Sequence, residues 1–220
     1  MYSTPDLPWI RVADFVRQHT HDVRNDLNSL DLEGSLLAEI VTDEEAKESI
    51  DRMRRQIRQA ASKLKALSAR FSEPRPVATP LAAGDLFEIW HEQEGTLSGP
   101  TNATWNSKLR GEELSVDAAL MAIALRELLE NAASFSAGGQ IAASAYTASD
   151  QAIFELQETK ADPVDPEKWC ASPLQSGKRG GYGLGLWQAN RIVRAHGGEL
   201  SQKYVPEGKS LVSSVRLPLA

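Results

Sequence analysis

The chain has 220 residues, enough for one large domain or two small ones, and its content of 41% hydrophobic and 25% charged residues is ordinary for a folded protein. The formal net charge of -6 argues against a protein that binds nucleic acid through a basic surface, because such proteins carry an excess of Lys and Arg. A single cysteine, Cys170, excludes an internal disulfide and favours a reducing compartment.

The sequence shows no targeting or membrane-spanning segment. Residues 1–8 lack a basic segment followed by an apolar run, so we expect no signal peptide. No window approaches the roughly 18 to 20 apolar residues that a membrane span needs. We therefore expect a cytoplasmic protein that associates with neither membrane nor nucleic acid.

Two closely spaced prolines, Pro74 and Pro76, mark the clearest boundary in the chain. Proline stops a helix and favours extended backbone, which is typical of a linker. The sequence before them is helical in pattern and highly charged, and strands and helices alternate after them. The sequence therefore predicts two domains, residues 1–74 and residues 75–220.

The first domain is predicted to be an antiparallel helical hairpin with a turn near residues 40–43. In the second helix, from Thr42 to Phe71, apolar residues recur at steps of three and four: Ile50, Met53, Ile57, Ala60, Leu64, Leu67 and Phe71. Thr42 followed by Glu45 has the form of a capping box. The first helix has a looser seam, which runs through Val12, Val16, Val23, Leu27, Leu30 and Leu37.

A lone hairpin has too little core to be stable, so the seam needs further helices. The simplest arrangement is a homodimeric four-helix bundle. Packing of both helices on the second domain is the alternative.

The second domain has a mixed pattern. We expect helices over 80–92, 117–135 and 184–196, and strands over 102–109, 140–146, 152–157, 199–204 and 210–217. Residues 163–179 have no periodicity and are predicted to form a loop. Asp117 is a candidate N-cap, and Gly197 lies where the last helix needs a positive φ angle. Antiparallel strands segregated from helices predict an α+β fold in which the second domain is a two-layer α/β sandwich.

A polar group on the first helix, His21, Asp22 and Asn25, is the first candidate site. On a helix His21 and Asn25 share one face, which points away from the apolar seam, whereas His19 falls near the seam. A nucleophilic imidazole needs a free nitrogen and an acid that fixes its tautomer, and Asp22 supplies the acid. The same residues would also be ordinary on the solvated face of an amphipathic helix.

Two further candidates lie in the second domain. Glu127 and Asn131 are one turn apart on an otherwise apolar helix, where they could hold a Mg²⁺-phosphate or form a polar edge. The glycine-rich stretch 180–186 runs into a helix that ends in His196-Gly197-Gly198. Glycines let backbone amides approach an anion closely, and a helix N-terminus favours negative charge, although such glycines also serve simply to start a helix.

Together, these segments resemble the core of two-component histidine kinases, from the phosphoacceptor box around His21 to the closing strand at Leu217. The resemblance implies that His21 is the phosphorylated residue, that Asp22 is its general base and that Asn25 helps to position water during dephosphorylation. It also implies a response regulator as the partner and a homodimer through the hairpin. Asp26 stands where the family has proline, so the helix kink below the histidine is expected to be weaker.

The resemblance extends to the ATP site. It implies that Asn131 ligates Mg²⁺ and that Glu127 is the general base or the residue that positions water. The implied contacts with ATP come from Asn131, Glu158, Gly181, Gly183, Leu184 and Gly185.

The adenine-recognition segment departs most from the family. Glu158 replaces the Asp that recognises the adenine amino group in the family. Lys160 and Asp162 replace two family glycines, which have no side chains and therefore leave room for the base. We expect the side chains of Lys160 and Asp162 to crowd the base pocket. The short loop 163–179 lies where the family has its ATP lid, and Ser134 replaces a basic residue that is frequent in kinases.

These features favour a kinase that phosphorylates His21 from Mg²⁺-ATP and passes the phosphate to a response regulator. The retained glycines favour this hypothesis. Each costs backbone entropy on ordering, so a domain that no longer bound phosphate would have little physical reason to keep them. An ATP-independent histidine phosphotransferase is the alternative, and a non-catalytic scaffold that docks regulators is a third.

Overall fold

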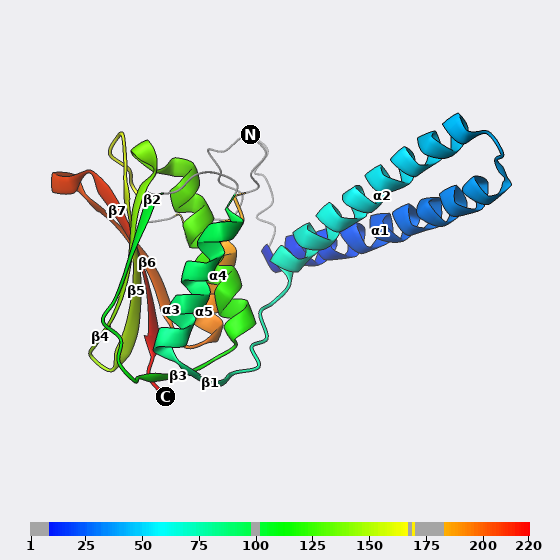
Figure 1. The fold of residues 1–220 in the computed structure, drawn as a ribbon. Helices are drawn as coiled ribbons and strands as arrows, with labels where there is room; N and C mark the ends of the chain where they lie inside the picture. The colour runs from blue at the N-terminus through cyan, green and yellow to red at the C-terminus, as the bar shows by residue number, and fades with distance from the viewer. Residues whose placement is uncertain (1–8, 98–101, 167–168, 170–182) are drawn as a thin grey trace, which may run out of the picture. The chain divides into compact units, whose positions relative to one another are not determined.

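The computed structural model describes residues 9–97, 102–166, 169 and 183–220. The chain divides into two compact units, residues 1–73 and residues 74–220 (Figure 1). Among the described residues, no helix combines the length and the apolar character that a bilayer crossing requires.

The first unit is a hairpin of two long helices, α1 (Trp9–Ile40) and α2 (Glu44–Phe71) (Figure 1). A three-residue connection, 41–43, joins them, as the sequence predicts. The predicted cap of α2 is wrong by one residue. Asp43 is the N-cap and its side chain accepts a hydrogen bond from the Ala46 amide, because the helix begins at Glu44 and Thr42 lies too far back to reach it.

Small residues and one charged cluster hold the two helices of the hairpin together. Ala13 and Thr20 are buried on α1. Gly34 lies against Arg54 of α2, whose Cγ is 2.9 Å from the place that a Cβ of residue 34 would occupy. Asp31 accepts hydrogen bonds from Arg54 at 3.0 Å and from Arg58 at 3.2 Å, which lower the pKa of its carboxyl group.

Part of the predicted seam of α1 does not pack within the hairpin. Leu30 is 47% exposed and Leu37 is 44% exposed. His19, which we expected near the seam, is exposed and stacks on the exposed ring of Phe15. The physical reason is that one neighbouring helix can cover only one side of α1, so that few of its side chains, Ala13 and Thr20 among them, are fully buried. The homodimeric bundle, which would cover more of the apolar surface, stays a prediction.

The second unit contains a five-stranded sheet in the order β2-β4-β5-β7-β6. Its strands are β2 (Asn102–Ser107), β4 (Gln140–Ala148), β5 (Gln151–Thr159), β6 (Glu199–Val205) and β7 (Ser210–Pro218). β2 pairs in parallel with β4, whereas all other neighbours are antiparallel. The sheet is therefore mixed, which corrects the prediction of an antiparallel one. The long helix between β2 and β4 provides the crossover that a parallel pair needs.

Three helices form the second layer and cover one face of this sheet (Figure 1). They are α3 (Ala83–Glu92), α4 (Ala118–Phe135) and α5 (Gly185–Ala195). Their buried apolar side chains pack on those of β4, β5 and β7 to form the core. The prediction of a hairpin followed by a two-layer α/β sandwich is confirmed.

Two helix ends in this unit have the cap residues that the sequence predicts. Asp117 caps α4 by accepting a hydrogen bond from the Leu120 amide at 3.1 Å, and Gly197 has a φ of 73° just after α5. The His196 ring accepts a hydrogen bond from the Asp117 amide at 3.0 Å. The end of α5 is thereby linked to the start of α4.

Some short elements differ from the prediction. Residues 79–82, expected partly as helix, form β1 (Thr79–Ala82), which pairs with the unpredicted β3 (Glu113–Val116). Three single turns of 3₁₀ helix complete the described elements: Gln93–Thr96, Ala137–Gly139 and Pro206–Gly208.

Candidate functional site

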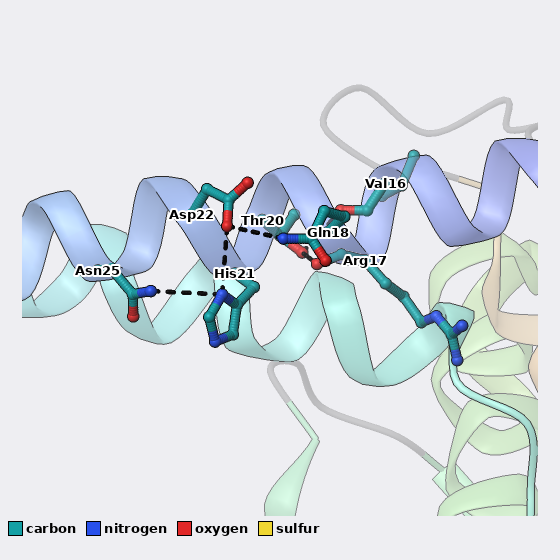
Figure 2. A network of polar contacts seen from close by, with 7 residues as sticks. All are labelled: Val16, Arg17, Gln18, Thr20, His21, Asp22 and Asn25. Carbon is teal, nitrogen blue, oxygen red and sulfur yellow. Dashed lines mark hydrogen bonds and ion pairs between the residues drawn. The ribbon is translucent and has the colours of Figure 1, made fainter.

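His21 lies on the exposed surface of α1, with 56% of its side chain accessible (Figure 2). Its Nδ1 atom is 3.3 Å from Asp22 Oδ1 and 3.3 Å from Asn25 Nδ2. The helix brings Asn25 to His21 because residues four apart are neighbours on one face. The structure therefore brings together all three residues that the sequence predicts for this site.

The two contacts at Nδ1 correspond to different tautomers of the imidazole. When Nδ1 carries the proton, it donates to Asp22 and leaves Nε2 with a free lone pair. When Asn25 donates to Nδ1, a neutral ring carries its proton on Nε2. Only the tautomer that Asp22 favours is a nucleophile at Nε2.

Asp22 is fixed by two neighbours. Its Oδ1 atom accepts a hydrogen bond from Gln18 Nε2 at 2.9 Å, in addition to the contact with His21 (Figure 2). These two hydrogen bonds, first that of His21 and then that of Gln18, lower the pKa of the Asp22 carboxyl group. Asp22 thus remains ionised at neutral pH and stabilises positive charge on the ring. Sequence reasoning missed Gln18, although its position four residues before Asp22 was the available signal.

An open groove of about 680 Å³ lies beside His21. Its lining includes Arg17 and Gln18 of α1 and Ser68 of α2. Arg17 forms an ion pair with Asp14 in the same groove. The histidine is thus accessible from a surface that has polar and charged groups.

The second cluster of predicted residues joins α4 to the start of α5. Glu127 and Asn131 are both half-buried on α4. Gly185, the first residue of α5, is so close to Glu127 that a Cβ there would overlap the Oε2 atom of the carboxylate. The structure thus places Glu127 against the glycine segment that the sequence assigns to phosphate binding.

The groups around this junction are suited to an anion and a hard cation. Gly183 has a φ of 62°, and Leu184 at the N-cap of α5 makes no capping hydrogen bond through its side chain. The amides in the first turn of a helix have no helical acceptor and favour negative charge, so the start of α5 has the chemistry that suits an anion. The side chain of Asn131 makes no hydrogen bond to any residue that the structure describes, so its amide oxygen is available to a metal-phosphate complex.

A metal would need ligands beyond the protein at this place. Within the described part of the chain, no three His, Cys, Asp or Glu side chains gather as a metal cluster. Mg²⁺ commonly takes one or two protein oxygens and completes its shell with phosphate and water, so Asn131 fits that mode. Gly181, Lys178, Arg179 and most of the predicted lid lie outside the described residues.

Residues 158–162, for which the resemblance implies adenine recognition, have a different chemistry from the one expected. Glu158, on β5, is buried and its Oε2 atom accepts a hydrogen bond from Lys160 Nζ at 2.8 Å. Burial raises the pKa of the Glu158 carboxyl group more than Lys160 lowers it. Asp162 is exposed, so of the two residues expected to crowd this segment only Lys160 is buried. Sequence reasoning missed the ion pair, although residues two apart share one face of a strand.

Comparisons with known proteins support this description of the fold. No family model matches the chain. Over 100 residues it is 39% identical to the sensor protein TorS of Escherichia coli (strain K12), a match that covers 43% of this chain and 11% of TorS. The chain therefore spans only a small part of that relative.

Solved structures, a sensor histidine kinase among them, have the same fold. Full-length ShkA, in complex with AMPPNP, matches 94% of this chain and 46% of its own with a TM-score of 0.67 and 16% identity. The mycobacterial sensor histidine kinase MprB matches 65% of this chain and 98% of its own with a TM-score of 0.55 and 19% identity. The chain has the fold of these solved structures, a helical hairpin followed by a two-layer α/β domain.

Proposed function

We propose that this histidine kinase-like chain phosphorylates His21 from Mg²⁺-ATP and transfers the phosphoryl group to an aspartate of a response regulator. The arrangement of His21 and Asp22 carries the proposal, because the Nδ1 atom faces a carboxylate at 3.3 Å while the ring stays exposed. That arrangement provides a nucleophile and the acid that fixes its tautomer.

The chemistry follows from this geometry. The Nε2 lone pair of His21 forms a bond to the terminal phosphorus of ATP, the bond to the bridging oxygen breaks, and ADP leaves. The ring becomes positively charged in this step, and Asp22 stabilises the charge and holds the proton at Nδ1. In the second step the N–P bond breaks and the phosphoryl group passes to a carboxylate of the regulator. Asn25 is assigned to position water when the phosphorylated regulator is hydrolysed.

The second unit is assigned to hold the phosphates of ATP. Asn131 and the first amides of α5 would bind the metal and the phosphate oxygens, and Glu127 beside Gly185 would position the reacting groups. Mg²⁺, when bound, would neutralise charge that develops on the phosphates. The AMPPNP named in the structure of ShkA, a protein of the same fold, is consistent with this assignment.

The same proposal includes a homodimer and a cytoplasmic location. Exposed apolar side chains on the hairpin, such as Leu30 and Leu37, would be covered by the helices of a second copy. ATP and response regulators are available in the cytoplasm.

A second candidate function, an ATP-independent histidine phosphotransferase, is favoured by one observation. Glu158, the residue assigned to adenine, is already paired with Lys160 and only 5% exposed. In this function His21 accepts the phosphoryl group from one regulator and gives it to another, and the second unit binds no nucleotide.

Labelling with ATP that carries a radioactive terminal phosphate separates the two functions. We expect acid-labile labelling of the full chain that His21→Ala abolishes. His19→Ala is the matched control, since His19 is also exposed on α1 two residues away, and labelling should persist in it. No labelling from ATP, together with transfer to His21 from a phosphorylated regulator, would instead support the phosphotransferase. A chain that performs neither transfer would refute both.

A further inference from the structure

The contact between His21 and Asp22 joins two consecutive residues of a helix, which ordinarily do not face each other. Nδ1 of His21 nevertheless lies 3.3 Å from Oδ1 of Asp22. The two side chains are 56% and 57% exposed, so packing constrains them little. The contact therefore depends on how the Asp22 carboxylate is turned.

Gln18 holds the carboxylate in this orientation. Its Nε2 atom donates to Oδ1 of Asp22 at 2.9 Å, the same oxygen that His21 contacts (Figure 2). Gln18 lies three residues before His21 and four before Asp22, so it is a neighbour of both on the helix surface. A carboxylate oxygen accepts more than one hydrogen bond, so both donors fit on Oδ1 at once.

Asn25 competes with Asp22 for the same atom of the ring. Its Nδ2 atom lies 3.3 Å from Nδ1 of His21, as far as Oδ1 of Asp22 lies from it. A neutral imidazole has one N–H, so Nδ1 either donates to Asp22 or accepts from Asn25. The ionised acceptor makes the stronger hydrogen bond, so Asp22 prevails while its carboxylate stays turned toward the ring.

We infer that Gln18 is a positioning residue for the reaction at His21: it holds the Asp22 carboxylate toward Nδ1 and so favours the tautomer whose Nε2 atom is free to attack. This inference rests on the proposed function of His21 as the phosphoryl acceptor. Gln18 acts through Asp22, and Asn25 acts in the opposite direction. A hydrogen bond between exposed side chains four residues apart is weak, so its loss should change the tautomer ratio by about twofold.

The test is the ratio of the two neutral tautomers of His21 in the full chain without nucleotide. Nuclear magnetic resonance gives this ratio from the chemical shifts of the two ring nitrogens, at a pH at which the ring is neutral, and His21→Ala assigns the signals. Gln18→Met keeps a long unbranched side chain but has no donor. In it we expect the ratio of the Nδ1–H to the Nε2–H tautomer to fall by about twofold, and the initial rate of His21 phosphorylation to fall by the same factor.

Two further variants separate this role from a merely structural one. Gln18→Lys provides an ammonium donor four residues before Asp22, so it should restore the ratio. Asn25→Ala removes the competing donor and should move the ratio the other way. A contribution of Gln18 to helix stability alone would move the tautomers in neither direction.

Gln56→Met is the matched control, because Gln56 is an exposed glutamine on α2 and its loss should leave the ratio as it is. Gln18 is itself exposed, so its variants remove no buried surface. An unchanged ratio in Gln18→Met, or no recovery in Gln18→Lys, would overturn the inference and leave the kinase proposal intact. Ratios that shift as expected in a chain whose His21 accepts phosphate from neither ATP nor a phosphorylated regulator would overturn the proposed function instead, and with it the role of Gln18 in a reaction.

Discussion

Replacing Gly185 with alanine should inactivate the proposed phosphate site while leaving the fold intact. A Cβ at residue 185 would overlap the Oε2 atom of Glu127 and lie 3.2 Å from its Cδ. Ordinary contacts of a Cβ begin at 3.4 Å, so the carboxylate must move away by about 1 Å. Because the overlapping atoms are at the end of a flexible side chain, the rest of α4 need not move.

We expect Gly185→Ala to change the free energy of unfolding only a little and the rate of His21 phosphorylation strongly. An off-rotamer Glu127 costs about 0.5–1.5 kcal/mol, and the reduced freedom of the unfolded chain offsets it by about 0.4–1 kcal/mol, so the free energy of unfolding should change by less than about 1 kcal/mol. A misplacement of about 1 Å at a reacting centre lowers rates by about 100-fold. We therefore expect His21 phosphorylation in Gly185→Ala to be about 100-fold slower.

The assay is the initial rate of label incorporation at saturating Mg²⁺-ATP, with urea unfolding as the measure of stability. Gly84→Ala in α3 is the matched control, because a Cβ at that glycine meets no atom within 4 Å. Its labelling rate should equal that of the unaltered chain. A Gly185→Ala variant that labels within twofold of the unaltered rate would refute the role assigned to Glu127.

Two further predictions concern stability. Lys160→Met should lower the free energy of unfolding by about 3 kcal/mol, because it leaves the buried Glu158 carboxylate without its counter-ion, and adding Glu158→Leu should restore most of the loss. Urea unfolding of the unaltered protein, the single variant and the double variant checks this, and a fully stable single variant would contradict it. Hydrogen bonds from the Arg110 amide and the Thr147 hydroxyl lower the pKa of Glu112 from 4.5 to about 2. The stability that Glu112 contributes is therefore full above pH 4.5 and lost as the pH falls through about 2. The difference in melting temperature between the protein and Glu112→Gln should shrink over that window, and a pH-independent difference would contradict the assignment.

The long helices were predictable because their signals are local and repeated. The apolar steps from Ile50 to Phe71 are sustained over several turns, and α2 ends at Phe71. Its start was misplaced by one residue because Thr42 and Asp43 are both good cap residues, and the conformation of the turn decides between them. β1 and β3 were missed because strands of four residues are too short to show a period.

The pairing of strands was not predictable from local patterns. β2 lies parallel to β4, and the sequence of β2 has no feature that distinguishes a parallel neighbour from an antiparallel one. The burial of β4 and β5 in one core follows from their apolar residues, but their order in the sheet depends on contacts far apart in the chain.

The candidate site likewise has one contact that the sequence predicts and one feature that it does not. Helical spacing predicts that Asn25 lies beside His21, and the structure has this contact. The pairing of Lys160 with Glu158 has a local signal in their alternate positions. Its burial depends on the Phe135 carbonyl at the end of α4, more than twenty residues away, which no local pattern reveals.

The most direct test of the account is the position of phosphate on the protein after incubation with Mg²⁺-ATP. Phosphohistidine isomers are distinguishable by nuclear magnetic resonance at neutral pH, and mass spectrometry assigns the residue. The account predicts phosphate on Nε2 of His21, because Nδ1 faces Asp22 at 3.3 Å. Phosphate on Nδ1, on another residue, or on none would contradict it.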